Sequence, residues 1–123
     1  MRRYHHYGVP ITEPMAGEHY HESISLHVVS YWKSPYSIEY FRFDPSYKNN
    51  PKVKDHPDII SEIPHVAFIV DDIKKEMEGK EIVYGPNTPI DNWTVCFIKE
   101  NGVLVELIET TLTDEEILKM SQS

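Results

Sequence analysis

The clearest pattern of hydrophobic positions lies in the second half of the chain. His65-Val66-Ala67-Phe68-Ile69-Val70 is a short apolar run, rich in β-branched and aromatic residues, which predicts a strand with both faces covered. Asp71-Asp72 then offers an N-cap, and Ile73 and Met77, spaced i, i+4, predict a short helix. Gly79 is suited to end that helix, because glycine tolerates the left-handed conformation after a last turn.

Three further strands are predicted after this helix. They are Glu81-Ile82-Val83-Tyr84, ended by Gly85-Pro86-Asn87, then residues 93–99, and then residues 103–108. The last two are joined around Asn101-Gly102, the dipeptide preferred in two-residue type I′ hairpins because both residues tolerate positive φ. The second half therefore predicts a βαβββ unit.

The first half offers similar strands with less regularity, at residues 6–11, 23–31 and 37–43. Residues 12–22 show no helical periodicity and contain both a proline and a glycine, which disfavour a helix. We therefore expect a first unit that has lost its helix.

The two halves repeat one another at their first and last strands. His6-Tyr7-Gly8-Val9 corresponds to His65-Val66-Ala67-Phe68, and Ile38-Glu39-Tyr40 corresponds to Val105-Glu106-Leu107. The histidine and the glutamate are 33 residues apart in the first half and 41 apart in the second, and the difference is about the length of a short helix. We predict an α+β fold in which two paired βαβββ-type modules form a curved mixed sheet around a metal cleft.

The end of the chain predicts a short helix over residues 112–121. Thr113-Asp114-Glu115-Glu116 matches a capping box, and Leu112 is placed to pack against Ile117. The apolar face of this helix needs a partner surface, on the same chain or on a neighbouring subunit. We expect a single domain over residues 1–123, with module one at 1–45, a linker at 46–63, module two at 64–110 and then the terminal helix.

Composition and charge exclude several classes of protein. A chain of 123 residues has the size of one domain, and its net charge of −8 without a basic stripe argues against nucleic-acid binding. No segment approaches the roughly 18 apolar residues of a membrane span, and the first residues lead into histidines, so we expect a cytoplasmic protein without a membrane partner. The single cysteine, Cys96, lies in an apolar run and is expected to fill the core.

Histidines and carboxylates within apolar strands suggest metal chemistry. A glutamate on a buried strand is costly unless it is paired, hydrogen-bonded or bound to a metal, and both Glu39 and Glu106 have apolar neighbours. Two histidines and two carboxylates converging in one cleft would suit Zn²⁺, Ni²⁺, Co²⁺, Fe²⁺ or Mn²⁺ and leave two positions of an octahedral ion open. His19, His21 and His56 lie in polar stretches and are expected at the surface.

Two segments resemble a known superfamily. Residues 64–73, Pro64-His65-Val66-Ala67-Phe68-Ile69-Val70-Asp71-Asp72-Ile73, together with residues 102–109, look like the second module of the vicinal oxygen chelate superfamily of glyoxalases, bleomycin-resistance proteins and extradiol dioxygenases. His5-His6-Tyr7-Gly8-Val9-Pro10 resembles the opening strand of its first module. The first-strand histidine and last-strand glutamate of each module are the usual metal ligands of that superfamily. The resemblance thus implies one divalent metal held by His6, Glu39, His65 and Glu106.

The choice of His6 over His5 rests on the alignment with His65. This alignment sets Gly8 against Ala67, and the alternation of side chains along a strand then predicts that His5 faces the opposite side.

The resemblance implies a glyoxalase-like lyase or isomerase that acts on a small oxygen-rich carbonyl compound, with Glu39 and Glu106 as candidates for ligand and base. A ring-cleaving dioxygenase would leave the position of Glu39 free, so Glu39 argues against it. The chain has few arginines outside its start, Arg42 alone, which puts a glutathione or coenzyme A substrate in doubt.

Two other functions remain open. The first is a metal-free protein that sequesters a small planar ligand between aromatic side chains, and the second is a regulatory module with vestigial histidines. The aromatic candidates are Tyr31, Trp32, Tyr36, Tyr40, Phe41 and Trp93. The resemblance also implies a homodimer. We expect its contact at the first-half strands, which carry aromatic residues and no helix of their own, and whether the modules pair within or between chains is left open.

Overall fold

The computed structural model describes residues 1–122, and in this part of the chain eight strands form one mixed sheet. Its order is β2-β3-β4-β1-β5-β8-β7-β6. The strands are β1 (Arg3–Pro10), β2 (His19–His21), β3 (Leu26–Val29), β4 (Ile38–Phe43), β5 (His65–Val70), β6 (Glu81–Ile90), β7 (Trp93–Glu100) and β8 (Val103–Glu109). The α-helices are α1 (Ile73–Met77) and α2 (Asp114–Gln122), and short 3-10 helices lie at Glu22–Ile24, Tyr31–Lys33, Pro45–Asn49 and Asp58–Ser61.

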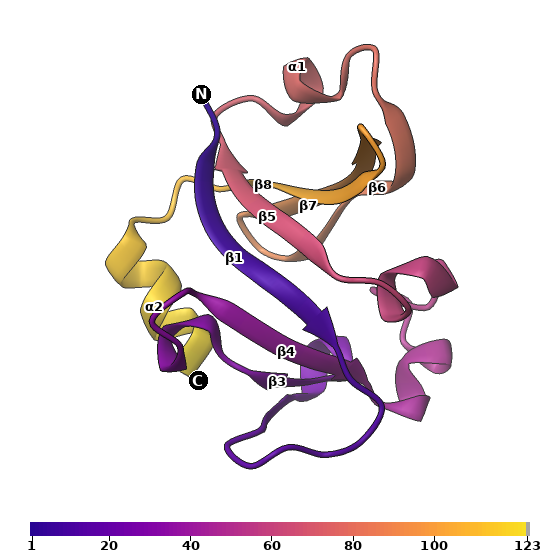
Figure 1. The fold of residues 1–123 in the computed structure, drawn as a ribbon, viewed down its shortest axis with the longest axis vertical. Helices are drawn as coiled ribbons and strands as arrows, with labels where there is room; N and C mark the ends of the chain where they lie inside the picture. Colours follow the sequence, from indigo (N-terminus) through magenta and orange to yellow (C-terminus); the bar gives the residue numbers. More distant parts are fainter. Residues whose placement is uncertain (123) are drawn as a thin grey trace.

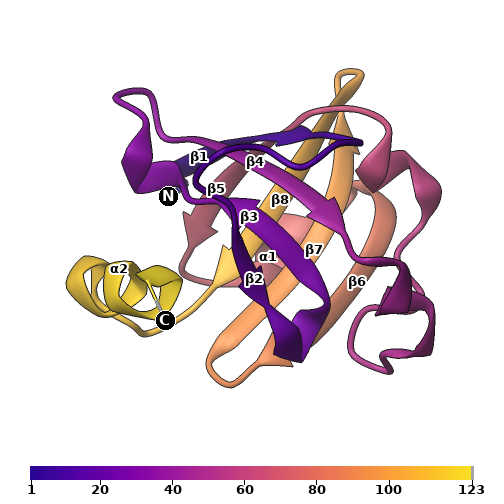
Figure 2. The same ribbon diagram turned by 90° about the horizontal axis from the view of Figure 1, so that it is seen from below.

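The sheet is built from two modules that pair within one chain. In module one β1 runs parallel to β4, and in module two β5 runs parallel to β8. The antiparallel pair of β1 and β5 joins the modules at the centre of the sheet (Figure 1). Viewed from below, the sheet curls into a half-barrel (Figure 2). The predicted α+β fold with two paired modules and a C-terminal helix is therefore confirmed.

Module two follows its hydrophobic pattern closely. The side chain of Asp72 accepts a hydrogen bond from the backbone N–H of Lys75 at 3.2 Å, so the predicted N-cap of α1 is confirmed. Asn101 and Gly102 have φ values of 52° and 80°, as the predicted type I′ hairpin between β7 and β8 requires.

The predicted end of β6 at Gly85 is wrong. The strand continues to Ile90, and its register with β7 shifts at three places, between Ile82 and Tyr84, between Tyr84 and Asn87, and between Asn87 and Ile90. Irregular pairing of this kind accommodates Gly85-Pro86 within the strand. The proline is also tolerated because β6 lies at the edge of the sheet, where its outer side forms no hydrogen bonds with another strand.

Module one lacks the helix of its counterpart. Residues 1–45, all of which the structure describes, contain only short 3-10 turns besides their strands. The strand β2, inside the stretch that shows no helical periodicity, was not predicted. It has three residues and pairs only with β3, so it is too short to show an alternating pattern.

The sheet has a separate core on each face. On the inner, concave face the buried side chains include Phe41, Ala67 and Phe97. On the outer face of module two, Cys96 and Leu107 are among the buried residues that pack under α1. Cys96 is fully buried, and burial raises the pKa of its thiol to about 11, in agreement with a core role.

The segment between the modules, expected to be a linker, contributes buried side chains to the fold. Val53 and Ile60, from its middle and its second 3-10 turn, are only 3% and 2% exposed. They contribute to the inner face, so the linker closes one side of the fold.

Helix α2 packs on its own chain. Thr113 and Glu116 exchange the two hydrogen bonds of a capping box, at 2.9 and 3.2 Å, which confirms the predicted N-terminus and sets the first helical residue at Asp114 rather than 112. Ile117 is 2% exposed and belongs to the inner core, so this residue finds its partner surface within the chain. Among residues 1–122, no helix is long and apolar enough to cross a membrane.

A cluster of ion pairs ties the start of the chain to module two. The guanidinium of Arg2 contacts Glu76 of α1 at 2.7 Å and Glu100 of β7 at 2.8 Å, and Lys80 contacts the other oxygen of Glu100 at 2.6 Å. Hydrogen bonds from Arg2 and Lys80 lower the pKa of Glu100 to about 2.

We expect the variant Glu100→Gln to show a weaker acid dependence of stability. Because the pKa of Glu100 in the folded protein lies below its ordinary value of 4.5, its stabilisation is present above that value and is lost as the pH falls toward 2. The pairs are partly exposed, so the variant should lose about 1 kcal/mol or less at neutral pH. Urea unfolding at neutral pH and at about pH 3 measures both effects. Glu81→Gln, an exposed position on β6, is the control, and an equal acid dependence in Glu100→Gln and wild type would contradict the expectation.

Candidate metal centre

The pairing of the strands brings the repeated histidines and glutamates to one place on the inner face. In the antiparallel pair of β1 and β5, His6 lies opposite Ala67, and Gly8 lies opposite His65. The parallel pairs place Glu39 beside Gly8 and Glu106 beside Ala67. The internal repeat seen in the sequence is thus a pseudo-twofold relation in the sheet.

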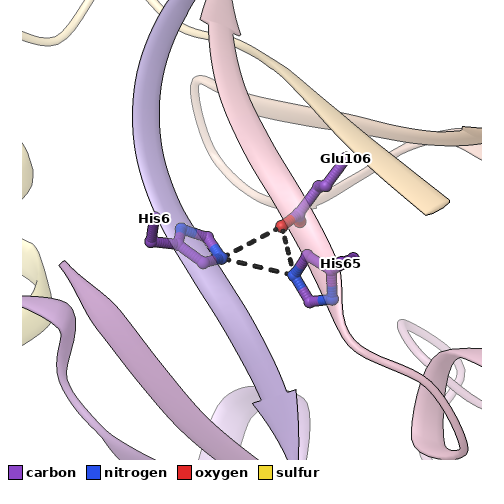
Figure 3. A group of neighbouring side chains, drawn as sticks. All are labelled: His6, His65 and Glu106. Carbon is purple, nitrogen blue, oxygen red and sulfur yellow. Dashed lines mark hydrogen bonds and ion pairs between the residues drawn. The ribbon is translucent and has the colours of Figure 1, made fainter. Parts of the chain in front are cut away.

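Three of the four predicted ligands converge closely. His6 Nε2 lies 3.3 Å from His65 Nε2 and 3.3 Å from Glu106 Oε1, and His65 Nε2 lies 3.2 Å from the same carboxylate oxygen. Figure 3 shows the two rings and the carboxylate pointing toward one another from β1, β5 and β8. Both histidines are 4% exposed, so the cluster is shielded from solvent.

Glu39 lies at the border of this cluster. Its Oε1 is 3.8 Å from His6 Nε2, and it falls outside the group of three whose ligand atoms are all within 4.8 Å of one another. Its side chain is 19% exposed, compared with 13% for Glu106. The pseudo-twofold relation is therefore broken at the two carboxylates.

The charges of the cluster are strongly coupled. Burial by itself raises the pKa of Glu106, but hydrogen bonds from His6 and His65 outweigh it and hold this pKa well below its ordinary value. Burial opposes protonation of His6, yet Glu39 and Glu106 raise its pKa above the ordinary value. A carboxylate held ionised beside two imidazoles is a suitable donor set for a cation.

The three donor atoms fit a divalent transition metal. With bonds of about 2.0–2.1 Å, the ligand atoms of a tetrahedral zinc site lie about 3.3 Å apart, which matches the three separations in this cluster. Imidazole nitrogen and carboxylate oxygen are common ligands of such ions. Among residues 1–122, the cluster of His6, His65 and Glu106 is the group whose geometry suits a metal.

Gly8 makes room for the ring of His65. A Cβ atom placed on Gly8 would lie 2.3 Å from His65 Cε1 and 2.4 Å from Nε2, distances that real side chains do not reach. On its other sides the His65 ring contacts Phe41 and Phe97, with ring centroids 5.4 and 5.2 Å away. The position of this donor is therefore fixed from three directions.

The expectation that His5 faces away from the site is wrong. The register between β1 and β5 shifts between Tyr4 and His6, so His5 occupies a bulge, and the bulge turns both histidines to the inner face. Nδ1 of His5 lies 2.7 Å from Nδ1 of His6. Burial, together with the charge of His6, lowers the pKa of His5 to about 4, so this ring is neutral near pH 7 and can accept a hydrogen bond from His6. The sequence shows the histidine doublet but not the bulge.

A cavity of about 180 Å³ adjoins the cluster on the inner face. Its walls come from both modules, the linker and α2, and they are mainly apolar. His56, expected at the surface, is one of the lining residues, with its ring centroid 5.0 Å from that of Phe43 and 4.4 Å from that of Tyr84. The linker carries His56 inward because Val53, whose carbonyl accepts a hydrogen bond from the ring at 2.9 Å, is buried.

Comparison with known proteins gives matches in structure but not in sequence. No protein-family model matches the chain, and no curated protein sequence matches it. The hypothetical protein BH1468 from Bacillus halodurans C-125 superposes with a TM-score of 0.52 at 15% identity, over 91% of this chain and 96% of the other.

Two solved structures of methylmalonyl-CoA epimerase are also similar. One, in complex with methylmalonyl-CoA and NH4+, has a TM-score of 0.46 at 14% identity, over 89% of this chain and 95% of the other. The other, from Mycobacterium tuberculosis, has a TM-score of 0.46 at 16% identity, over 98% and 92%.

The paired modules define the class of fold. Each module has parallel first and last strands, and the two first strands join the modules around the histidine and glutamate cluster. This is the arrangement that the resemblance in sequence to the vicinal oxygen chelate superfamily implied, and BH1468 shares the fold. The likeness to the solved structures is one of fold, and the function has to be argued from the site.

Proposed function

We propose that the protein is a metal-dependent lyase or isomerase of the glyoxalase-like class, which acts on a small oxygen-rich carbonyl compound. The observation that carries this proposal is the convergence of His6, His65 and Glu106 within hydrogen-bond distance, with the second carboxylate of Glu39 beside them. One Zn²⁺, Ni²⁺, Co²⁺, Mn²⁺ or Fe²⁺ ion is the cofactor that this donor set suits.

The two carboxylates have separate roles in this proposal. Glu106, engaged by both histidines, is a metal ligand, and Glu39 is either a fourth ligand or the base. A divalent metal bound here would act as a Lewis acid on the substrate oxygen that it contacts. Glu39, more exposed and less engaged than Glu106, has the freer carboxylate for moving a proton.

The reaction needs only a proton shuttle from the protein. Glu39 takes a proton from the carbon next to the carbonyl, the electron pair of that C–H bond forms a C=C bond, and the carbonyl π pair moves onto oxygen. Where the deprotonated carbon bears a hydroxyl, the hydroxyl proton passes to the new oxyanion and Glu39 delivers its proton to the former carbonyl carbon, so the carbonyl is re-formed on the other carbon and the product is an isomer. Where the carbon on the far side of the deprotonated carbon bears a leaving group, re-forming the original carbonyl shifts the C=C bond and expels that group with its electron pair, which is a lyase reaction.

The second candidate is the metal-free protein that sequesters a small ligand. The observation in its favour is the mainly apolar cavity, to which Tyr31, Phe41 and Trp93 contribute aromatic rings. Trp32 and Tyr36 do not support it, because they are 41% and 75% exposed. The same two-histidine, one-carboxylate set serves Fe²⁺ oxygenases, and the nearness of Glu39 is what favours a lyase or isomerase over a ring-cleaving dioxygenase.

The cytoplasmic location and the homodimer stay predictions from the sequence. In support of the dimer, module one has no helix over its outer face, and the tyrosines there are open to solvent. Tyr4, Tyr7 and Tyr36 are 48%, 41% and 75% exposed.

Deuterium exchange tests the proposed chemistry. With metal-loaded protein in D₂O, 2-hydroxyacetophenone and hydroxyacetone supply exchangeable protons next to a carbonyl, and proton NMR follows their loss. We expect metal-dependent exchange in the wild type and at least about 100-fold slower exchange in Glu39→Gln with its metal retained. Glu81→Gln is the control with an unchanged rate. Metal-loaded wild type that leaves the protons of both compounds in place would overturn the proposal.

A further inference from the structure

The cavity beside the metal centre has walls that select a particular ligand. Phe41 and Phe97 flank the ring of His65, and Leu26 and Val95 extend the apolar surface away from it. Its volume of about 180 Å³ slightly exceeds that of cavities of about 150 Å³ that bind benzene. A six-membered ring with one or two small substituents fills such a space.

The charges around this cavity limit the charge of the ligand. No lysine or arginine is among its lining residues in the described part of the chain. The full charges near the metal centre are the carboxylates of Glu39 and Glu106, which a divalent ion balances. A phosphate, or a second carboxylate, on the ligand would therefore be buried without a cationic partner, which is costly.

We infer that the substrate of this centre is a small, mainly apolar, ring-sized compound with two neighbouring oxygens as its chelating group and at most one negative charge. The oxygens face His6, His65 and Glu106, and the apolar body lies against Phe41 and Phe97. This inference rests on the proposed function for its metal and adds the nature of the rest of the substrate. Phosphorylated sugars and polyanionic carriers do not fit inside the cavity.

A series of hydroxamates tests the inference, because each binds a metal through two neighbouring oxygens and only the body differs. Protein loaded with Zn²⁺ is titrated by calorimetry with acetohydroxamate, benzohydroxamate and 4-carboxybenzohydroxamate. We expect benzohydroxamate to bind at least about tenfold more tightly than acetohydroxamate, since its ring buries more apolar surface. The added carboxylate of 4-carboxybenzohydroxamate should remove most of that gain in affinity.

Two variants locate the effect in the cavity. Leu26→Ser introduces a hydroxyl into the wall of the cavity. This variant should bind benzohydroxamate about tenfold more weakly than the wild type does, with little change in its affinity for acetohydroxamate. Val103→Ser, at an exposed position on β8, is the control and should change neither of these two affinities. Equal or weaker binding of benzohydroxamate to the zinc-loaded protein, or no binding of any hydroxamate, overturns the inference and leaves the metal centre standing.

A different result identifies failure of the proposed function itself. If the protein binds no zinc, and benzohydroxamate binds equally well before and after treatment with a chelator, then both the metal centre and the chelated substrate are wrong. Those results would instead support the metal-free binding protein.

Discussion

Glu106→Gln and His65→Ala are each expected to abolish metal binding, whereas the wild type should hold about one divalent ion per chain. Each substitution removes one of three donors from a cluster in which His6, His65 and Glu106 lie 3.2–3.3 Å apart. Glutamine keeps the size of glutamate but loses the charge that balances the ion. The two donors that remain fall short of the three protein ligands of a catalytic zinc site.

Elemental analysis of untagged protein, before and after incubation with Zn²⁺, Ni²⁺ and Mn²⁺, measures the stoichiometry. A thermal-shift series with the same ions is a second readout, because an ion that binds only the folded state raises the unfolding midpoint. His27→Ala is the control. His27 Nε2 lies 3.1 Å from Asp44 Oδ1 and is not part of the cluster, so this variant should keep its metal. Wild type without metal after every incubation, or variants that retain it, would contradict the metal centre.

Gly8→Ala should weaken metal binding about 100-fold or more without touching a ligand. Only a methyl group is added, but its carbon would lie 2.3 Å from His65 Cε1, and Phe41 and Phe97 leave the ring little room to move. Because Gly8 does not have a left-handed backbone, alanine brings no conformational strain. The overpacking should also cost about 1–3 kcal/mol of unfolding free energy.

Metal titration and urea unfolding of Gly8→Ala separate the two effects. Ala67→Gly is the matched control, since Ala67 faces His6 as Gly8 faces His65, and the change opens space instead of filling it. The control should keep its metal and lose about 1 kcal/mol of stability. A Gly8→Ala protein with wild-type metal affinity would show that the His65 ring lies elsewhere.

Module two and the terminal helix could be predicted from sequence because their signals are local. The N-cap at Asp72, the hairpin at Asn101-Gly102 and the capping box at Thr113 each depend on residues within a few positions of one another. These backbone contacts form in the same way wherever the segment packs, so the pattern alone is enough to place them.

The failures in the fold have a different physical origin. The bulge at His5 is set by how β1 meets β5, which are about 60 residues apart in the chain, and β6 runs past Gly85 only because β7 is there to pair with it. The inward turn of His56 depends on the burial of Val53 against the finished sheet. Local pattern carries no information about such long-range partners.

The candidate site lies between these cases. The repeat of histidine and glutamate identified the four positions, and the sheet register then brings them together. Sequence could not show that Glu39 stands farther from the histidines than Glu106, because that difference is one of side-chain position and not of strand order.

The pairing of β1 with β5 has a consequence for how such a protein can arise. A site that takes one histidine from each of two matching modules is already complete when two identical copies of a single module meet across the same strands. Duplication and fusion of that module then free each half to change alone. In this chain module two has an outer helix and a glutamate that both histidines contact, whereas residues 1–45 form no α-helix and Glu39 lies farther from the histidines.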